Sequence, residues 1–372
     1  MADNAFTANG RVKAPVGVTP VKLKEMKSLV EATLTGDRAA KGRLEEVLTS
    51  TDAIFSYSHL TALNFLPQYD RAPRTWTQLA GTRTVSDFRK PVLYSMAAEW
   101  SDLGNDKGST DSVAPVIPEG APYPFAHMSG EESKSGGIRK RGFQTAFTFE
   151  AFINDSINFI QSLPGEMLRV ALETEEYEVY GALLDGVTAA QQVAGGKSTD
   201  GTTVTANPVF SRAALDRALI EHSNRKINGR QVVVTGGYNL VVPVGQARFV
   251  NFLLNQTMFE TQSGSNKLSV NGFNPFADVT VVETQYVTGN AWYILPKPGA
   301  TSRPVLDRAS LVGHEAPELR VEGQQGNYVG GGAVSPFEGS FTNDDARFRL
   351  RVIGGGILWS PDLVIYSTGA AA

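Results

Sequence analysis

The sequence predicts an α+β fold that is rich in loops. The strongest helical periodicity runs through residues 150–184, and a strict alternation of arginines with apolar residues runs through 346–353. The 372 residues include 37 glycines and 19 prolines, which is a large share of turn-forming residues. A chain of this length divides into about two or three ordinary domains, so a substantial buried core is available.

Composition excludes several kinds of function. The chain has no cysteine, which rules out disulfides, thiolate metal sites and a cysteine nucleophile. Its 34 basic and 38 acidic residues give a net charge of -4, which does not fit a broadly basic nucleic-acid coat. No apolar run approaches the roughly 18 to 20 residues of a membrane-spanning helix, and residues 1–20 do not resemble a signal peptide. We therefore expect a soluble, cytoplasmic chain without a membrane partner.

The N-terminal region is predicted to be an arm followed by helices. Glycines and prolines interrupt residues 1–20, and apolar residues at helical spacing in 21–50 predict two short helices around Gly36. Residues 55–76 mix aromatic residues with prolines and predict an irregular traverse that packs against another element.

Residues 88–149 are predicted to form a long two-stranded hairpin. Strand-like runs at 91–96 and 138–149 flank about forty polar residues that are rich in glycine and proline. Because an isolated hairpin is only marginally stable in water, we expect this one to lie on a neighbouring subunit.

The helical region at 150–184 is predicted to be two helices divided at Pro164 and Gly165. Four glutamates gather around the second helix, and their pattern favours a solvated face. A metal site is the alternative, but it would require the carboxylates to converge, and most of them point to different sides. The four residues are Glu173, Glu175, Glu176 and Glu178.

An α/β layer is predicted from the helix at 211–224 to the strand at 291–295, as a second domain. A helix spans 211–224 with Ser211 as its N-cap, and a second helix spans 249–259. Short apolar strands are expected at 230–235, 279–283 and 291–295. The chain closes with strands at 346–353 and 362–367, the first of which has its arginines on one face.

Motifs for catalysis or cofactor binding are not found. The four histidines lack the spacing of a metal site, and residues 195–199 resemble a phosphate-binding loop whose first glycine is replaced by Gln191. Glycines at 330–332 and 354–356 lack the dinucleotide-binding form and predict turns and bulges. The sequence therefore predicts no catalytic residue, no cofactor and no metal.

A cluster of charges near the end of the predicted hairpin is the candidate contact region. It is either a solvated strand end or a patch that pairs with acidic groups on another subunit, and the sequence supports both interpretations equally. Contact with phosphate through three basic residues would be weak and salt-sensitive. The candidate contact residues are Glu131, Glu132, Lys134, Arg139, Lys140 and Arg141.

The order of these segments resembles the major capsid proteins of tailed bacteriophages, which have the HK97-like fold. The resemblance lies in residues 115–120 and 134–142 of the hairpin, 147–155 at the entry to the long helix, and 345–352 with 361–365 at the end. It implies an N-terminal arm at 1–50, a peripheral-domain traverse at 51–85 and an E-loop at 86–147. It further implies a peripheral domain with a spine helix at 148–209, an axial domain at 210–335 and closing peripheral strands at 336–372.

The resemblance also implies a function. Such a protein would self-assemble as hexamers and pentamers into an icosahedral shell around double-stranded DNA, in the host cytoplasm, and would reside in the virion capsid. Its partners would be a portal, a separate scaffold or cement protein, and DNA held by weak non-specific contact. Because only a short arm precedes the fold, a separate scaffold or none is expected. Lys107 and Lys134 lie in the loop, but no matching asparagine or carboxylate is found, so no crosslink is predicted.

Three alternatives remain at this point. An encapsulin-like compartment protein would share the fold, although this chain has a longer loop excursion and arm than such a shell needs. A soluble α/β enzyme would need an unrecognised site in 210–335, built on single carboxylates such as Asp278, Glu283 and Asp307. A non-enzymatic binding module would use the long hairpin to grip its partner.

Overall fold

The computed structural model describes residues 68–97, 117–123, 127–132, 135–148, 159–227, 230–255, 258–263, 266–271, 274–322, 329, 341–343 and 345–370. The predicted arm at 1–50 lies outside the described residues. The chain forms two compact units: unit 1 takes the described parts of 1–74, 139–175 and 311–353, and unit 2 those of 75–138, 176–310 and 354–372. Both helices and strands are present, so the predicted α+β class is confirmed.

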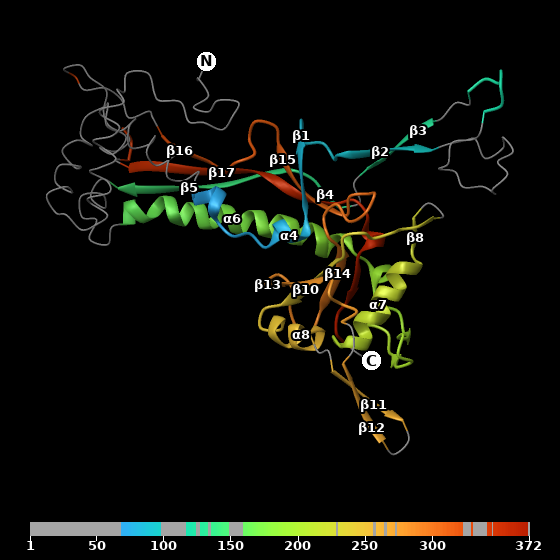
Figure 1. The fold of residues 1–372 in the computed structure, drawn as a ribbon. Coiled ribbons are helices and arrows are strands. Elements are labelled where there is room, and N and C mark those ends of the chain that lie inside the picture. Colours follow the sequence, from blue (N-terminus) through green and yellow to red (C-terminus); the bar gives the residue numbers. More distant parts are fainter. Residues whose placement is uncertain are drawn as a thin grey trace. The chain divides into compact units, whose positions relative to one another are not determined.

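Unit 1 packs a small sheet against a helix. Strands β5 (Arg139–Thr148) and β16 (Glu318–Val321) both pair with β17 (Asp345–Leu358), and α6 (Phe159–Gly186) runs alongside them (Figure 1). β17 and α6 each continue into unit 2. The predicted alternation on β17 is confirmed, because Phe348, Leu350 and Val352 are buried against α6 residues such as Met167 while Arg349 is exposed.

The long helix α6 is continuous, so the predicted division at Pro164 and Gly165 is wrong. Proline removes one backbone donor and normally breaks a helix interior. Here the residues on both sides share a buried face, because Leu163 and Met167 pack under the sheet. Burial of that face outweighs the loss of one hydrogen bond.

Unit 2 contains a four-stranded sheet in the order β13-β10-β14-β18. Its strands are β13 (Val279–Thr284), β10 (Tyr238–Pro243), β14 (Trp292–Pro296) and β18 (Ile365–Ser367). The β10–β13 pair is parallel and the other two pairs are antiparallel.

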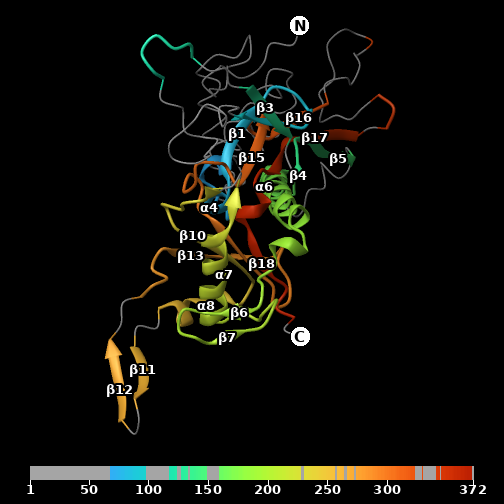
Figure 2. The same ribbon diagram turned by 90° about the vertical axis from the view of Figure 1, so that its right-hand side faces the viewer.

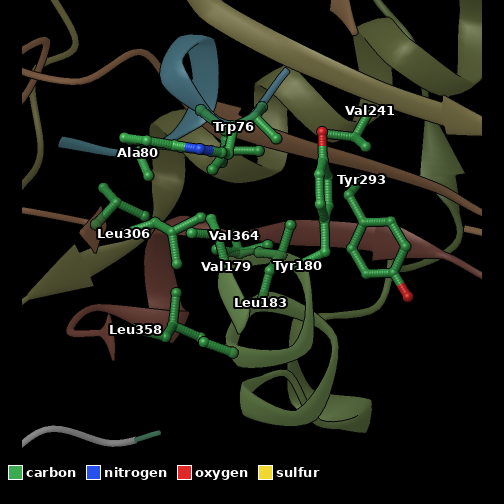
Figure 3. Packing of buried hydrophobic residues seen from close by; sticks show 14 of the residues in the cluster. Trp76, Ala80, Val179, Tyr180, Leu183, Val241, Tyr293, Leu306, Leu358 and Val364 are labelled. Atoms are coloured by element: carbon green, nitrogen blue, oxygen red, sulfur yellow. The ribbon is translucent and has the colours of Figure 1, made fainter. Parts of the chain in front are cut away.

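Both faces of this sheet are covered. Val241 faces a core with α4 (Trp76–Leu79) and the end of α6, where Trp76, Tyr180 and Leu183 gather (Figure 3). Leu240 faces a second core with α7 (Arg212–Asn224) and α8 (Ala247–Leu254). Burial on both faces explains the continuous apolar run of β10, a strand that was not predicted.

The helix predicted at 211–224 is confirmed, and the Ser211 side chain accepts a hydrogen bond from the Ala214 N–H at 3.1 Å. The strands predicted at 279–283 and 291–295 are also confirmed. The helix predicted at 249–259 ends at Leu254, because 258–263 form β11 (Met258–Ser263), which pairs with β12 (Asn266–Asn271) in a hairpin that projects from unit 2 (Figures 1 and 2).

Unit 2 also contains several short elements. They are β6 (Gly196–Lys197) with β7 (Thr203–Val204), β8 (Lys226–Ile227) with β9 (Arg230–Gln231), and the 3-10 turns Ala189–Gln191 and Pro361–Leu363. The strand predicted at 230–235 is therefore limited to two residues, and that predicted at 362–367 begins only at Ile365. Within the described ranges, every helix is too short or too polar to cross a bilayer.

The predicted hairpin is paired differently from the expectation. β2 (Val92–Ala97) pairs with β3 (His127–Glu132), whereas the strand at 139–148 joins β17 instead (Figure 1). Both predicted runs are strands, but the prediction that they are partners is wrong. The apolar alternation of β5 matches the face of β17 that packs on α6, and Phe147 joins that core beside Phe348.

The remaining strands of unit 2 lie around the second half of β17. β15 (Leu306–Leu311) pairs with it on one side and β4 (Ser135–Gly136) pairs with it over two residues. β1 (Gly81–Val85) pairs with β15.

Candidate functional site

A charged face covers the sheet of unit 1 on the side away from α6. In the antiparallel register, Glu318 lies opposite Arg351 and Arg320 lies opposite Arg349. Directly opposite residues point to the same side of a sheet, so these four side chains share one surface. Arg347 belongs to the same alternation on β17. We call this surface the arginine face: Arg320, Arg347, Arg349 and Arg351, with the carboxylate of Glu318 and with Lys140 of β5, which lines a hollow together with Arg349 and Arg351.

Glu318 organises one end of the arginine face. Its Oε2 accepts from Arg351 Nη2 at 2.5 Å and from Arg320 Nη2 at 2.7 Å, and its Oε1 contacts His314 Nδ1. Burial alone would raise the pKa of Glu318, but hydrogen bonds from Arg320, His314 and Arg351 outweigh burial and hold the pKa below its ordinary value. The carboxylate is therefore charged at neutral pH and holds both arginines in place.

Two cations of this surface remain uncompensated. Arg347 is used within the unit, because its Nε donates to Asp345 at 2.8 Å and lies 3.7 Å from Glu322. Arg349 and Lys140 are exposed, and the side chain of neither forms an ion pair or hydrogen bond within the part of the chain that the structure describes. These two positive charges are available to an acidic partner.

Two adjoining hollows lie along this surface. One, of about 380 Å³, is lined by Gln144, 320–322 and 347–349. The other, of about 270 Å³, is lined by 140–144 and 349–351. Arg349 lines both hollows, so a ligand with carboxylate or phosphate groups would meet it from either one. Guanidinium groups bind such anions in paired hydrogen bonds.

The structure locates most of the predicted contact residues. Arg139, Lys140 and Arg141 are the first residues of β5, and the last two line the second hollow beside Arg349 and Arg351. Arg139 and Lys140 are exposed and Arg141 is half-buried. The arginines of β17 were not predicted as contact residues, although their alternation in the sequence was the signal for a shared face.

The predicted acidic residues fall in the other unit. Glu131 and Glu132 belong to β3, where they pair with Leu93 and Val92, and Lys134 lies outside the described residues. The structure therefore does not join the acidic and basic members of the predicted cluster within one unit.

Two of the four glutamates of α6 make structural contacts, and the prediction of a solvated face is wrong for these two. Glu175 is only 2% exposed, accepts a hydrogen bond from the Tyr69 hydroxyl and lies 3.4 Å from Arg74 Nε. Glu176 accepts from the N–H and hydroxyl of Thr75 at 2.6 and 2.7 Å. These contacts hold the chain before α4 on the helix. No cluster able to bind a metal ion occurs among the residues described.

The carboxylates considered for an enzyme have other partners. Asp307 is buried and its Oδ2 accepts from Arg83 Nε at 3.0 Å and Trp359 Nε1 at 2.9 Å. Glu283 accepts from the backbone N–H of Gly245, and Asp278 is exposed in a turn. Residues 195–199 do not form a phosphate cradle, because their backbone donor at Thr199 is bonded to the Asp216 carboxylate at 2.5 Å.

Comparison with known proteins identifies the class. The model of a family described as phage capsid protein matches residues 131–366, which is more than half of the chain. The chain belongs to this family. It is therefore a structural protein of a phage capsid shell rather than an enzyme, it resides in the virion capsid, and its copies assemble into a homo-oligomeric shell.

Several solved structures are similar at low identity. A virus-like particle from Pyrococcus furiosus is 13% identical with a TM-score of 0.41, covering 84% of this chain and 99% of the other. A structure from Gordonia phage Cozz is 13% identical with a TM-score of 0.40, covering 79% and 86%. The encapsulin of a complex from Synechococcus elongatus is 9% identical with a TM-score of 0.42, covering 81% and 88%. No curated protein sequence matches the chain.

Proposed function

We propose that the chain assembles as pentamers and hexamers into an icosahedral shell that encloses double-stranded DNA, with an HK97-like fold. In this assignment residues 1–50 are the N-terminal arm, 51–85 the traverse and 86–147 the E-loop. The peripheral domain takes 148–209, with α6 as its spine helix, and 336–372, while 210–335 form the axial domain. The family match, the 28-residue helix and the closing strand β17 support this assignment.

The arginine face is the observation that carries the assembly proposal. Its free cations, Lys140 and Arg349, would be paired by carboxylates of another copy. A neighbouring copy supplies them through Glu131 and Glu132 of its β2–β3 hairpin. Such a contact joins two different surfaces of the same chain, and contacts of this heterologous type close into rings. The proposed contact residues are Glu131, Glu132, Lys134, Arg139, Lys140 and Arg141, joined by Arg349.

A protein partner fits the arginine face better than DNA does. Glu318 and Glu322 lie on β16 or directly after it, among the arginines, so the surface is mixed in charge. A polyanion would be repelled by these carboxylates, whereas a short acidic segment can meet the two free cations alone. DNA is held elsewhere in the shell by weak, salt-sensitive contact. The further partners are a portal and a separate scaffold or cement protein, with assembly in the host cytoplasm.

Charge reversal tests the contact. The double variant Lys140→Glu with Arg349→Glu should remain folded by circular dichroism but lose shells in light scattering and negative-stain images. Arg71→Glu is the matched control, since Arg71 is an exposed cation of the same unit outside the arginine face. Its shells should match the unmodified protein.

A charge swap tests whether the two glutamates are the partners of the two cations. Glu131→Lys with Glu132→Lys should also block assembly, and combining this pair with Lys140→Glu and Arg349→Glu should restore shells. Normal assembly of the Lys140→Glu and Arg349→Glu variant would remove the arginine face from the contact. Failure of the combined variant to recover would show that the two acidic residues are not its partner.

A further inference from the structure

Three glycines lie inside a strand where the sequence predicted turns and bulges. Gly354, Gly355 and Gly356 belong to β17 and pair with Ser310, Ala309 and Arg308 of β15, so that prediction is wrong for these residues. All three are buried. Glycine weakens a strand interior because it has no side chain to pack and loses more conformational entropy on folding, so a run of three in a buried strand requires a steric reason.

That reason is backbone contact on both faces of β17. A Cβ atom on Gly356 would lie 2.4 Å from the Glu178 carbonyl oxygen and 2.7 Å from the Ala182 Cβ, both on α6. A Cβ on Gly355 would lie 2.0 Å from the Gly137 carbonyl oxygen. β17 therefore passes between α6 and the segment that contains β4, and neither neighbour leaves room for a methyl group.

The segment that crosses β17 is itself built of glycine. Gly136 has a φ of +87°, and a Cβ there would lie 1.8 Å from the Gly356 carbonyl oxygen. The ladder between β4 and β17 has only two residue pairs, Ile357 with Gly136 and Leu358 with Ser135. We call Gly136, Gly137, Gly355 and Gly356 the glycine crossing. Because its ladder is so short, close backbone packing is what fixes this segment on β17.

The glycine crossing stands at the base of the β2–β3 hairpin. β3 ends at Glu132, and β4 begins three residues later, where the returning chain meets β17 (Figure 1). On the entry side, β1 pairs with β15. Arg83 of β1 donates to Asp307 of β15, which anchors the entry strand. Both ends of the hairpin are therefore fixed to neighbouring strands of unit 2.

We propose that the glycine crossing is a positioning element for assembly: it fixes the direction in which the β2–β3 hairpin projects from β15 and β17 of unit 2. This inference rests on the function proposed above, in which that hairpin contacts a neighbouring copy. A methyl group at Gly355 displaces the crossing segment, whereas a methyl group at Gly356 displaces α6 and the core under it. Substitution of Gly355 therefore tests the placement of the hairpin, and substitution of Gly356 tests the packing of the core.

The test compares three alanine variants. Gly355→Ala should keep its helical circular dichroism and should lower the thermal midpoint less than Gly356→Ala does, but its shell yield should fall at least tenfold. Gly137→Ala is the matched control, because a Cβ there meets nothing within 4 Å and its φ is not positive, and it should assemble normally. Gly356→Ala should lower the thermal midpoint, since its Cβ meets α6.

A distance measurement reads hairpin placement directly. The chain has no cysteine, so spin labels on Ser95→Cys in β2 and Asp185→Cys at the exposed end of α6 report one distance within unit 2. In Gly355→Ala, the distance distribution should shift or broaden relative to the parent, and in Gly137→Ala it should not. A loss of stability alone would leave this distance unchanged.

A second variant guards against misfolding. Inserting two glycines between Gly136 and Gly137 loosens the crossing without adding a side chain, and should shift the distance and reduce shell yield as Gly355→Ala does. Normal assembly or an unchanged distance in either folded variant would overturn the proposal. The distance does not depend on assembly, so it still tests the crossing if the Lys140→Glu and Arg349→Glu variant forms normal shells and the proposed contact fails.

Discussion

Glu318 and Arg351 lie directly opposite each other on β16 and β17, and Arg351 Nη2 donates to Glu318 Oε2 at 2.5 Å. Two residues before Arg351, on the same face of the same strand, Arg349 is exposed and has no ion pair within the described residues. One alternating strand therefore supplies both an internal ion pair and an exposed charge, which we propose meets a neighbouring copy. The first keeps the sheet together and the second is available for assembly.

Replacing Glu318 by glutamine should destabilise unit 1. The change leaves Arg351 and Arg320 without their shared carboxylate, and loss of such charged hydrogen bonds costs about 2 kcal/mol. The pKa of Glu318 is lower in the folded chain than in the unfolded chain. The carboxylate therefore contributes its full stabilisation of the fold above the pKa of the unfolded chain, and this contribution is lost as the pH falls through the pKa of the folded chain. Urea denaturation at several pH values should give unfolding free energies for the unmodified protein and for Glu318→Gln that approach each other in acid. Equal unfolding free energies at pH 7 would contradict the prediction.

His222 should make the protein less stable as pH falls below 6.5. The ring is fully buried, with Nε2 at 3.2 Å from the Leu363 carbonyl oxygen, and burial lowers its pKa from 6.5 to about 4. The unfolded chain then binds more protons between these two values, so stability falls with pH across this range by up to about 3 kcal/mol and levels off below it.

The measurement for His222 is denaturation of the unmodified protein and of His222→Gln at several values between pH 7 and pH 4. The difference in unfolding free energy between the two should change across this window, because the glutamine does not titrate. A constant difference would show that the histidine is protonated without cost in the folded chain.

Two glycine-to-alanine changes in unit 1 should act in opposite directions. A Cβ on Gly142 of β5 would lie 2.2 Å from the Leu350 carbonyl oxygen, so Gly142→Ala must separate β5 from β17 and lower the thermal midpoint. Gly165 is exposed in α6, and a Cβ added there would meet nothing within 4 Å. Gly165→Ala should raise stability by about 0.5 to 1 kcal/mol, through helix propensity. Calorimetry of both variants measures the change in thermal midpoint, which should be negative for Gly142→Ala and positive for Gly165→Ala.

Asp307→Asn should destabilise unit 2 far more than Asp87→Asn. Asp307 is buried and accepts from both Arg83 and Trp359, so its change should cost about 2 kcal/mol. Asp87 lies on the surface at 4.0 Å from Arg89, and such a pair contributes about 0 to 1 kcal/mol. Similar losses for the two variants in chemical denaturation would contradict the structural role of Asp307.

Sequence patterns of short range predicted the local elements well. The alternation of Arg347, Arg349 and Arg351 with apolar residues depends only on the two-residue period of a strand, and the Ser211 cap depends on contacts three residues apart. The continuous helix through Pro164 was not predicted, because the burial of its face depends on a sheet whose strands come from distant parts of the chain.

The sequence by itself determined the α+β class, the strand that carries the arginines and, through the resemblance, the family of capsid proteins. Only the tertiary structure decided that β5 pairs with β17 and not with β2. The alternation of apolar and polar residues along β5 is compatible with either partner strand. It alone placed Glu318 opposite Arg351 and packed Gly355 against Gly137. Those contacts join residues far apart in the chain, and their steric and electrostatic energies arise only when the strands have met.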